Sequence, residues 1–115
     1  FTNHIEFNLL PRNDWSTNSC WLYTLFLADE NIGLRDALIE RIGQRGIDAR
    51  VGFYPMHEMP PYSRFGKSNY PHSTQLSRGI ISLPTSLGLS EEDIRYIGTT
   101  VVNEFRAIKE RDFNE

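Results

Sequence analysis

The sequence has little cysteine and little lysine, and each shortage excludes a kind of site. Its 115 residues include one cysteine, Cys20, which excludes an internal disulfide and any zinc site built from several thiolates. Cys20 opens an apolar segment, so we expect a buried small side chain rather than a nucleophile. Only two of the 12 basic residues, Lys67 and Lys109, are lysines, and the other ten are arginines. Chemistry that requires a lysine amine therefore has two candidate positions in this chain.

Long apolar runs and an excess of positive charge are also absent. No apolar run approaches the roughly 20 residues that span a bilayer, and no basic-then-apolar leader is present, so we expect a cytoplasmic protein without membrane contacts. A formal net charge of −3 argues against nucleic-acid binding through a basic face. His4, His57 and His72 lie far apart and no two have metal-ligand spacing, which predicts no metal site.

What the sequence does contain is the pattern of one folded domain. Apolar residues make up 39% of the chain, enough for a single core. Their periodicity predicts strands at residues 20–27, 47–54 and 80–83, and helices at 34–44 and from residue 90 onward. The order strand, helix, strand, long loop, strand, helix predicts two layers, with the helices packed on one face of a small sheet.

Capping signals bound the predicted helices. Gly46 stands where a left-handed cap ends the first helix, and Ser90 with Asp93 forms a capping-box-like start for the last one. A second short helical turn is expected at residues 73–78. The last helix carries an apolar stripe that we expect in the core: Ile94, Ile97, Val101, Phe105 and Ile108.

The first 18 residues are rich in turn formers and predict irregular structure. The chain opens on Phe1 rather than on a methionine. We therefore expect a piece of a longer protein, in which residues 1–19 form a connecting arm and residues 20–115 form the domain.

The candidate site is the segment from Arg50 to Tyr62. It delivers an arginine, a phenol (Tyr54) and an imidazole (His57) from a strand end into a loop stiffened by proline. Arg50 offers a planar fork of donors for a carboxylate or a phosphate, and His57 exchanges protons near neutral pH. The structural alternative is equally open: Arg50 pairs with a surface carboxylate while Tyr54 and Tyr62 anchor the loop.

Several segments together resemble the C-terminal small domain of the DegT/StrS family of pyridoxal-phosphate-dependent sugar aminotransferases, and its perosamine-synthase-like members in particular. The resemblance covers about residues 20–104 in collinear order. The segments that carry it are WLYT (21–24), LRDAL (34–38), GIDAR (46–50), FYPMH (53–57), PPY (60–62), LSRGIISLP (76–84) and LSEEDI (89–94).

The fold that this resemblance implies is a small two-layer α+β sandwich, with helices packed on a short, mostly antiparallel sheet. The parent would be a fold type I enzyme that transfers an amino group from glutamate to a nucleotide-linked keto-sugar, in polysaccharide biosynthesis or a related pathway. A large domain outside this chain would bind most of the pyridoxal phosphate and supply its lysine, and the full-length enzyme would be a homodimer.

In this family the small domain supplies a wall of the substrate pocket, and the residues that match it here are Arg50, Phe53, Tyr54, Pro55 and His57. Val51 and Gly52 stand where relatives often carry bulkier residues or proline. Neither Lys67 nor Lys109 lies in surroundings that match the cofactor-lysine segment of the family, so the resemblance implies that this chain alone is inactive and carries no catalytic residue.

Two alternatives remain open at this stage. The first is a free-standing α+β binding or regulatory domain for a small anionic metabolite, which the same loop from Arg50 to His57 supports. The second is an RNA-binding sheet with exposed aromatic residues, which has the right elements but lacks a basic surface and an aromatic strand signature.

Overall fold

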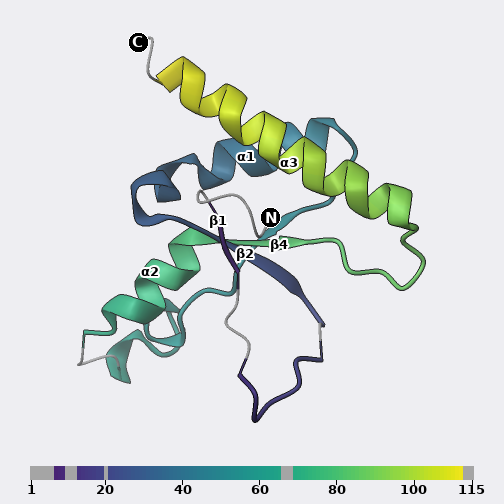
Figure 1. Ribbon diagram of the computed structural model, residues 1–115. Coiled ribbons are helices and arrows are strands. Elements are labelled where there is room, and N and C mark those ends of the chain that lie inside the picture. The colour runs from purple at the N-terminus through teal and green to yellow at the C-terminus, as the bar shows by residue number, and fades with distance from the viewer. Residues whose placement is uncertain (1–6, 10–12, 20, 66–68, 113–115) are drawn as a thin grey trace.

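The computed structural model describes residues 7–9, 13–19, 21–65 and 69–112, and shows an open four-stranded sheet with helices packed on it (Figure 1). The strands are β1 (Phe7–Leu9), β2 (Tyr23–Leu27), β3 (Arg50–Val51) and β4 (Ile80–Leu83), in the spatial order β1-β2-β4-β3. Every pairing among them is antiparallel. The predicted α+β sandwich is therefore confirmed.

Three α-helices and three 3₁₀ turns complete the described part of the chain. The helices are α1 (Arg35–Gln44), α2 (Pro71–Gly79) and α3 (Glu91–Asp112), and the 3₁₀ turns are η1 (Asp29–Leu34), η2 (Met56–Glu58) and η3 (Ser63–Phe65). None of these described helices is both long and apolar enough to cross a membrane.

The predicted caps are present at both helices. Gly46 has a φ of +81°, in the left-handed region that favours glycine, just after α1. At the start of α3, the backbone N–H of Asp93 donates to Ser90 Oγ at 3.1 Å, and the backbone N–H of Ser90 donates to Asp93 Oδ2 at 2.8 Å. This reciprocal pair fixes the first turn of α3.

The core lies between the sheet and the layer formed by α1 and α3, which cover one face (Figure 1). Alternate residues of β2 and β4 point into it, because successive side chains of a strand face opposite ways. The central residues are Leu25, Leu27, Ile81 and Leu83 from the sheet, Leu38 and Ile42 from α1, and Val101, Phe105 and Ile108 from α3.

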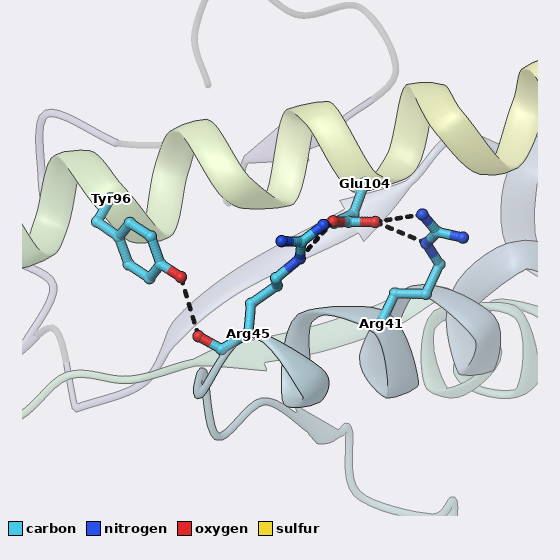
Figure 2. Close-up of polar contacts among 4 residues, drawn as sticks. All are labelled: Arg41, Arg45, Tyr96 and Glu104. Carbon is cyan, nitrogen blue, oxygen red and sulfur yellow. Dashed lines mark hydrogen bonds and ion pairs between the residues drawn. The ribbon is translucent and has the colours of Figure 1, made fainter.

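A buried carboxylate joins α1 to α3 on top of this core (Figure 2). Glu104 of α3 accepts from Arg41 Nε at 2.6 Å and from Arg45 Nε at 2.9 Å, both on or beside α1. Tyr96 adds a hydrogen bond, donated by its hydroxyl to the carbonyl of Arg45 at 3.0 Å. These contacts fix how the two helices lie against each other.

The expectation of irregular structure up to residue 18 is wrong for residues 7–9. They form β1, in which Phe7 lies opposite Leu27 of β2. Phe7 is buried, and its ring lies 5.1 Å from that of Phe105, centroid to centroid. A three-residue edge strand has too few residues to show a periodic pattern, so periodicity does not predict it. The connection of this arm to a further domain stays a prediction.

Two further expectations need correction. The strand predicted at residues 47–54 is reduced to Arg50–Val51, because Ile47 turns into the core and the chain leaves the sheet at Gly52. Ile94, expected in the core stripe of α3, is 57% exposed, whereas the other members of that stripe are buried. Cys20 lies outside the described residues, so its burial stays a prediction.

The second face of the sheet is only partly covered. The prediction of helices on one face holds for α1 and α3, whereas α2 lies on the other side of the sheet (Figure 1). Thr24 and Ser82 lie directly opposite each other on β2 and β4, and they alternate with the buried core residues. Together with α2 and the loop after β3, they leave a hollow on this face.

Candidate functional site

The hollow has a volume of about 360 Å³ and is bounded by the sheet, by α2 and by the loop after β3. The sheet forms its floor, α2 forms one wall, and the loop after β3 forms another. Its lining residues are Leu22, Thr24, Gly52, Phe53, Tyr54, Pro55, Met56, Ser73, Leu76, Ser77, Ile80 and Ser82.

Three of the five predicted site residues line this hollow: Phe53, Tyr54 and Pro55. Pro55 is buried and anchors the loop, whereas the rings of Phe53 and Tyr54 are 76% and 71% exposed. The exposed Trp21 stacks on Phe53, with ring centroids 6.4 Å apart and planes inclined by 25°. The loop therefore presents aromatic faces to solvent instead of burying them as anchors.

Gly52 is the residue that brings this loop close to the sheet. Its N–H donates to the carbonyl of Ile80 at 3.3 Å. A Cβ placed on Gly52 would stand 2.6 Å from Cγ2 and 2.9 Å from Cβ of Ile80, closer than ordinary packing tolerates. The missing side chain lets the backbone lie close beside Ile80 of β4, so a larger residue at this position would push the wall of the hollow outward.

Arg50 stands at the edge of the hollow without lining it. It lies opposite Ser82, which in turn lies opposite Thr24, so the three residues form a row across one face of β3, β4 and β2. Arg50 Nη2 donates to Asp48 Oδ2 at 2.9 Å, and both side chains are largely exposed. The hydrogen bond and the charge of Asp48 raise the pKa of Arg50, which is therefore a permanent cation at the rim.

His57 lies behind the loop, against α2. Its Nε2 is 3.3 Å from Thr74 Oγ1 and 3.7 Å from Glu58 Oε1, and its ring centroid is 4.8 Å from that of Tyr70. Thr74 and Glu58 were not among the predicted site residues. Thr74 and Glu58 are 16 residues apart in the sequence and are joined by a hydrogen bond between their side chains, a contact that no local sequence pattern predicts.

The chemistry of this hollow suits binding rather than bond breaking. Hydroxyl groups of Thr24, Ser73, Ser77 and Ser82 alternate with apolar and aromatic walls, and no carboxylate, imidazole, amine or thiol is among the lining residues. Such a surface suits a ligand with hydroxyl groups and apolar faces, with Arg50 placed for an anionic group near the edge.

A second, larger groove of about 810 Å³ lies on a different part of the molecule. It runs between the loop that joins β4 to α3 and the first half of α3, where Leu87 and Ile94 are exposed. None of the predicted site residues lines it. Among the described residues, no three histidine, cysteine, aspartate or glutamate side chains gather in a way that would hold a metal ion.

Comparison with known proteins identifies the family of the chain. The sequence matches the model of the DegT/DnrJ/EryC1/StrS aminotransferase family over residues 2–102. The chain therefore belongs to this family, as its sequence resemblance indicated.

Two curated relatives carry the same name. The chain is 35% identical over 74 residues to GDP-perosamine synthase of Caulobacter vibrioides, which covers 64% of this chain and 20% of that protein. It is 32% identical over 92 residues to GDP-perosamine synthase of Vibrio cholerae, which covers 79% of this chain and 25% of that protein. The chain thus matches a quarter or less of the length of these relatives.

Solved structures agree with the fold. Aminotransferase TlmJ of Streptoalloteichus hindustanus superimposes with a TM-score of 0.81 at 19% identity, over 93% of this chain and 28% of that one. Sugar aminotransferase CalS13 of Micromonospora echinospora gives a TM-score of 0.74 at 18% identity, over 87% of this chain and 26% of that one. At these identities the likeness establishes the architecture alone.

Members of this family use pyridoxal phosphate, which requires a lysine amine for covalent attachment. Lys109 is the lysine within the described residues; it lies near the end of α3, where its Nζ is 5.8 Å from the centroid of the Phe105 ring. It is not among the residues that line the hollow. Lys67 lies outside the described residues. The described part of the chain therefore offers no lysine amine at the hollow for covalent attachment of the cofactor.

Proposed function

We propose that this chain is the C-terminal domain of a pyridoxal-phosphate-dependent aminotransferase that transfers an amino group from glutamate to a nucleotide-linked keto-sugar. Membership of the aminotransferase family and the two relatives named GDP-perosamine synthase support this reaction class. The observation that carries the role of this domain is the hollow lined by hydroxyl groups and by Phe53, Tyr54 and Pro55.

In this proposal the domain contributes a wall of the substrate pocket. The exposed faces of Phe53 and Tyr54 contact apolar faces of the sugar or the base, and the serine and threonine hydroxyls bond its polar groups. Arg50 exchanges its exposed partner Asp48 for a carboxylate or phosphate of the substrate, at little cost because exposed ion pairs are weak. A large domain outside this chain binds most of the cofactor and supplies its lysine. A homodimeric state and a cytoplasmic location stay predictions.

The reaction is tested with the full-length parent enzyme, glutamate and a panel of nucleotide-linked keto-sugars, by following the aminated product. Conversion of at least one keto-sugar to its amino-sugar supports the proposal. Absence of product across the panel, with an enzyme that binds pyridoxal phosphate, contradicts the substrate class.

The first site prediction concerns Arg50. In the full-length enzyme, we expect Arg50→Ala to raise KM for the anionic substrate about tenfold, because the variant loses a charge-assisted hydrogen bond to that substrate. His57→Ala is expected to raise KM as well. Arg111→Ala, at the exposed end of α3, is the matched control and should leave KM unchanged. Unchanged turnover and affinity in both site variants would remove these residues from the pocket.

The second prediction concerns the chain by itself. Titrated with pyridoxal phosphate, the 115-residue chain should give no saturable absorbance band of lysine-bound cofactor, whereas the full-length enzyme should give one. Lys67→Gln and Lys109→Gln variants serve as controls for adventitious reaction at either amine. A saturable band in the chain that disappears in one of these variants would show that the chain holds its own cofactor lysine.

A further inference from the structure

Thr74 of α2 connects the loop of the hollow to the helix behind it. Its Oγ1 lies 2.6 Å from Glu58 Oε1 and 3.3 Å from His57 Nε2, and both of these residues belong to η2. The His57 side chain is 20% exposed and Glu58 is 42% exposed, so the contact is shielded on one side and open on the other. η2 directly follows Pro55, which is one of the residues that line the hollow.

The number of protons on these groups fixes the direction of the hydrogen bonds. An ionised carboxylate accepts hydrogen bonds and donates none, so the single hydroxyl proton of Thr74 points to Glu58. The hydroxyl oxygen can then only accept from His57, which places a proton on Nε2. In the neutral ring, Nδ1 carries a lone pair. It has no hydrogen-bond partner within the described part of the chain.

The surroundings of the imidazole agree with this arrangement. The ring of Tyr70 packs against it at an angle of 47°, and the carboxylate of Glu58 lies 3.7 Å from its Nε2. Backbone bonds make η2 a rigid support: the N–H of Glu58 donates to the carbonyl of Pro55 at 3.0 Å, and that of Met59 donates to the carbonyl of Met56 at 3.1 Å. The imidazole is therefore held at three points: by its own backbone, by Thr74 and by Tyr70.

We propose that Thr74 is a positioning residue of the substrate pocket, whose hydroxyl holds the His57 ring with Nε2 protonated and so fixes η2 directly behind Pro55, at the wall of the hollow. This inference rests on the proposed function for the role of the loop, but the direction of the hydrogen bonds stands on the geometry alone. His57 receives its orientation from Thr74, and Thr74 itself does not touch the substrate.

The test uses the full-length enzyme with ¹⁵N-labelled histidine rings, at a pH at which the rings are neutral. The His57 signal is the one that disappears in His57→Asn. We expect the wild-type ring to be protonated at Nε2, with a proton that exchanges slowly with water. Thr74→Val, which keeps the side-chain shape, should accelerate this exchange at least tenfold, and Thr74→Ser should restore it. Glu58→Ala, which leaves α2 intact, should accelerate exchange of the Nε2 proton in the same way. This variant provides the measurement if Thr74→Val does not fold.

Two results overturn the inference: protonation of the wild-type ring at Nδ1, or a His57 signal in Thr74→Val and Glu58→Ala that matches the wild type. Kinetics then separate it from the proposed function. Thr74→Val should raise KM for the keto-sugar more than it lowers kcat, with rescue by Thr74→Ser. If the ring signal responds as expected while KM does not change, the hydrogen bonds from His57 to Thr74 and from Thr74 to Glu58 are confirmed. The role of this loop as a wall of the substrate pocket is then contradicted.

Discussion

Phe105→Ala should lower the free energy of unfolding by about 3–5 kcal/mol, as measured by urea denaturation, because it removes a large side chain from the centre of the core. Phe105 is 0% exposed, and its ring faces that of Phe7 at a centroid distance of 5.1 Å and an interplanar angle of 56°. It lies on α3, so the loss would weaken the contact between α3 and the sheet and leave a cavity where the surrounding structure cannot fully close.

Phe65→Ala is the matched control for this variant. The same chemical change is made at a position that is 67% exposed in η3, where an effect of about 0.5 kcal/mol or less is expected. A loss of comparable size in both variants would show that Phe105 does not lie in the core. The double variant of Phe7 and Phe105 adds a second measurement: a coupling energy of about 0.5–1.5 kcal/mol is expected if β1 is part of the folded sheet.

The elements that the sequence predicted are those whose cause is local. Leu34, Leu38 and Ile42 predict α1 because a helix brings positions four apart onto one face, and Gly46 ends it because a left-handed φ favours glycine. The capping box of Ser90 and Asp93 fixes the start of α3 by the same kind of short-range contact.

The elements that were missed depend on contacts distant in sequence. Phe7 becomes part of a strand because it pairs with Leu27 of β2 and packs against the ring of Phe105. Nothing around residue 7 in the sequence indicates either partner. Ile94 matches the helical stripe, yet it is exposed because α3 extends beyond the part of the core that would cover it. Periodicity places a residue on a face of a helix, but only tertiary packing decides where that face is covered.

The candidate site shows the same division. The prolines that follow the predicted strand at residues 47–54 indicated a structured loop at its end, and the structure shows Phe53, Tyr54 and Pro55 at a hollow. The sequence left open that Arg50 pairs with a surface carboxylate, and the structure shows this pairing with Asp48. The contact of His57 with Thr74 had no signal in the sequence. Arg50 lies two residues from Asp48, but their pairing depends on side-chain directions at the edge of the sheet, and Thr74 reaches His57 only because α2 folds back behind the loop.

The second large effect is expected at Glu104, where Glu104→Gln should lower the free energy of unfolding by about 1–3 kcal/mol at neutral pH. The carboxylate is 8% exposed and pairs with Arg41 and Arg45, whose side chains are 25% and 59% exposed. Replacement by an amide of the same shape removes the negative charge between two guanidinium groups (Figure 2). Because Arg45 keeps access to water, the loss stays below that of a fully buried pair.

The pH dependence of this difference follows from the direction of the pKa shift. The hydrogen bond from Arg41 lowers the pKa of Glu104 in the folded state below the ordinary value of 4.5, with smaller contributions from the charge of Arg41 and from Arg45. A lowered pKa in the folded state gives stability that is complete above 4.5 and is lost as the pH falls through the folded pKa, because the unfolded chain binds the proton first. The difference between wild type and Glu104→Gln should therefore shrink below pH 4.5.

Urea denaturation of both proteins at neutral pH and at several pH values below 4.5 measures this change. At low pH, the protonated carboxyl group and the amide of Gln become alike in charge and shape, so the two unfolding curves should converge. Glu40→Gln on the exposed face of α1 is the matched control, and its small effect should not depend on pH in this way. A difference between wild type and Glu104→Gln that stays constant down to pH values well below 4.5 would show that the charge of Glu104 does not join α1 to α3.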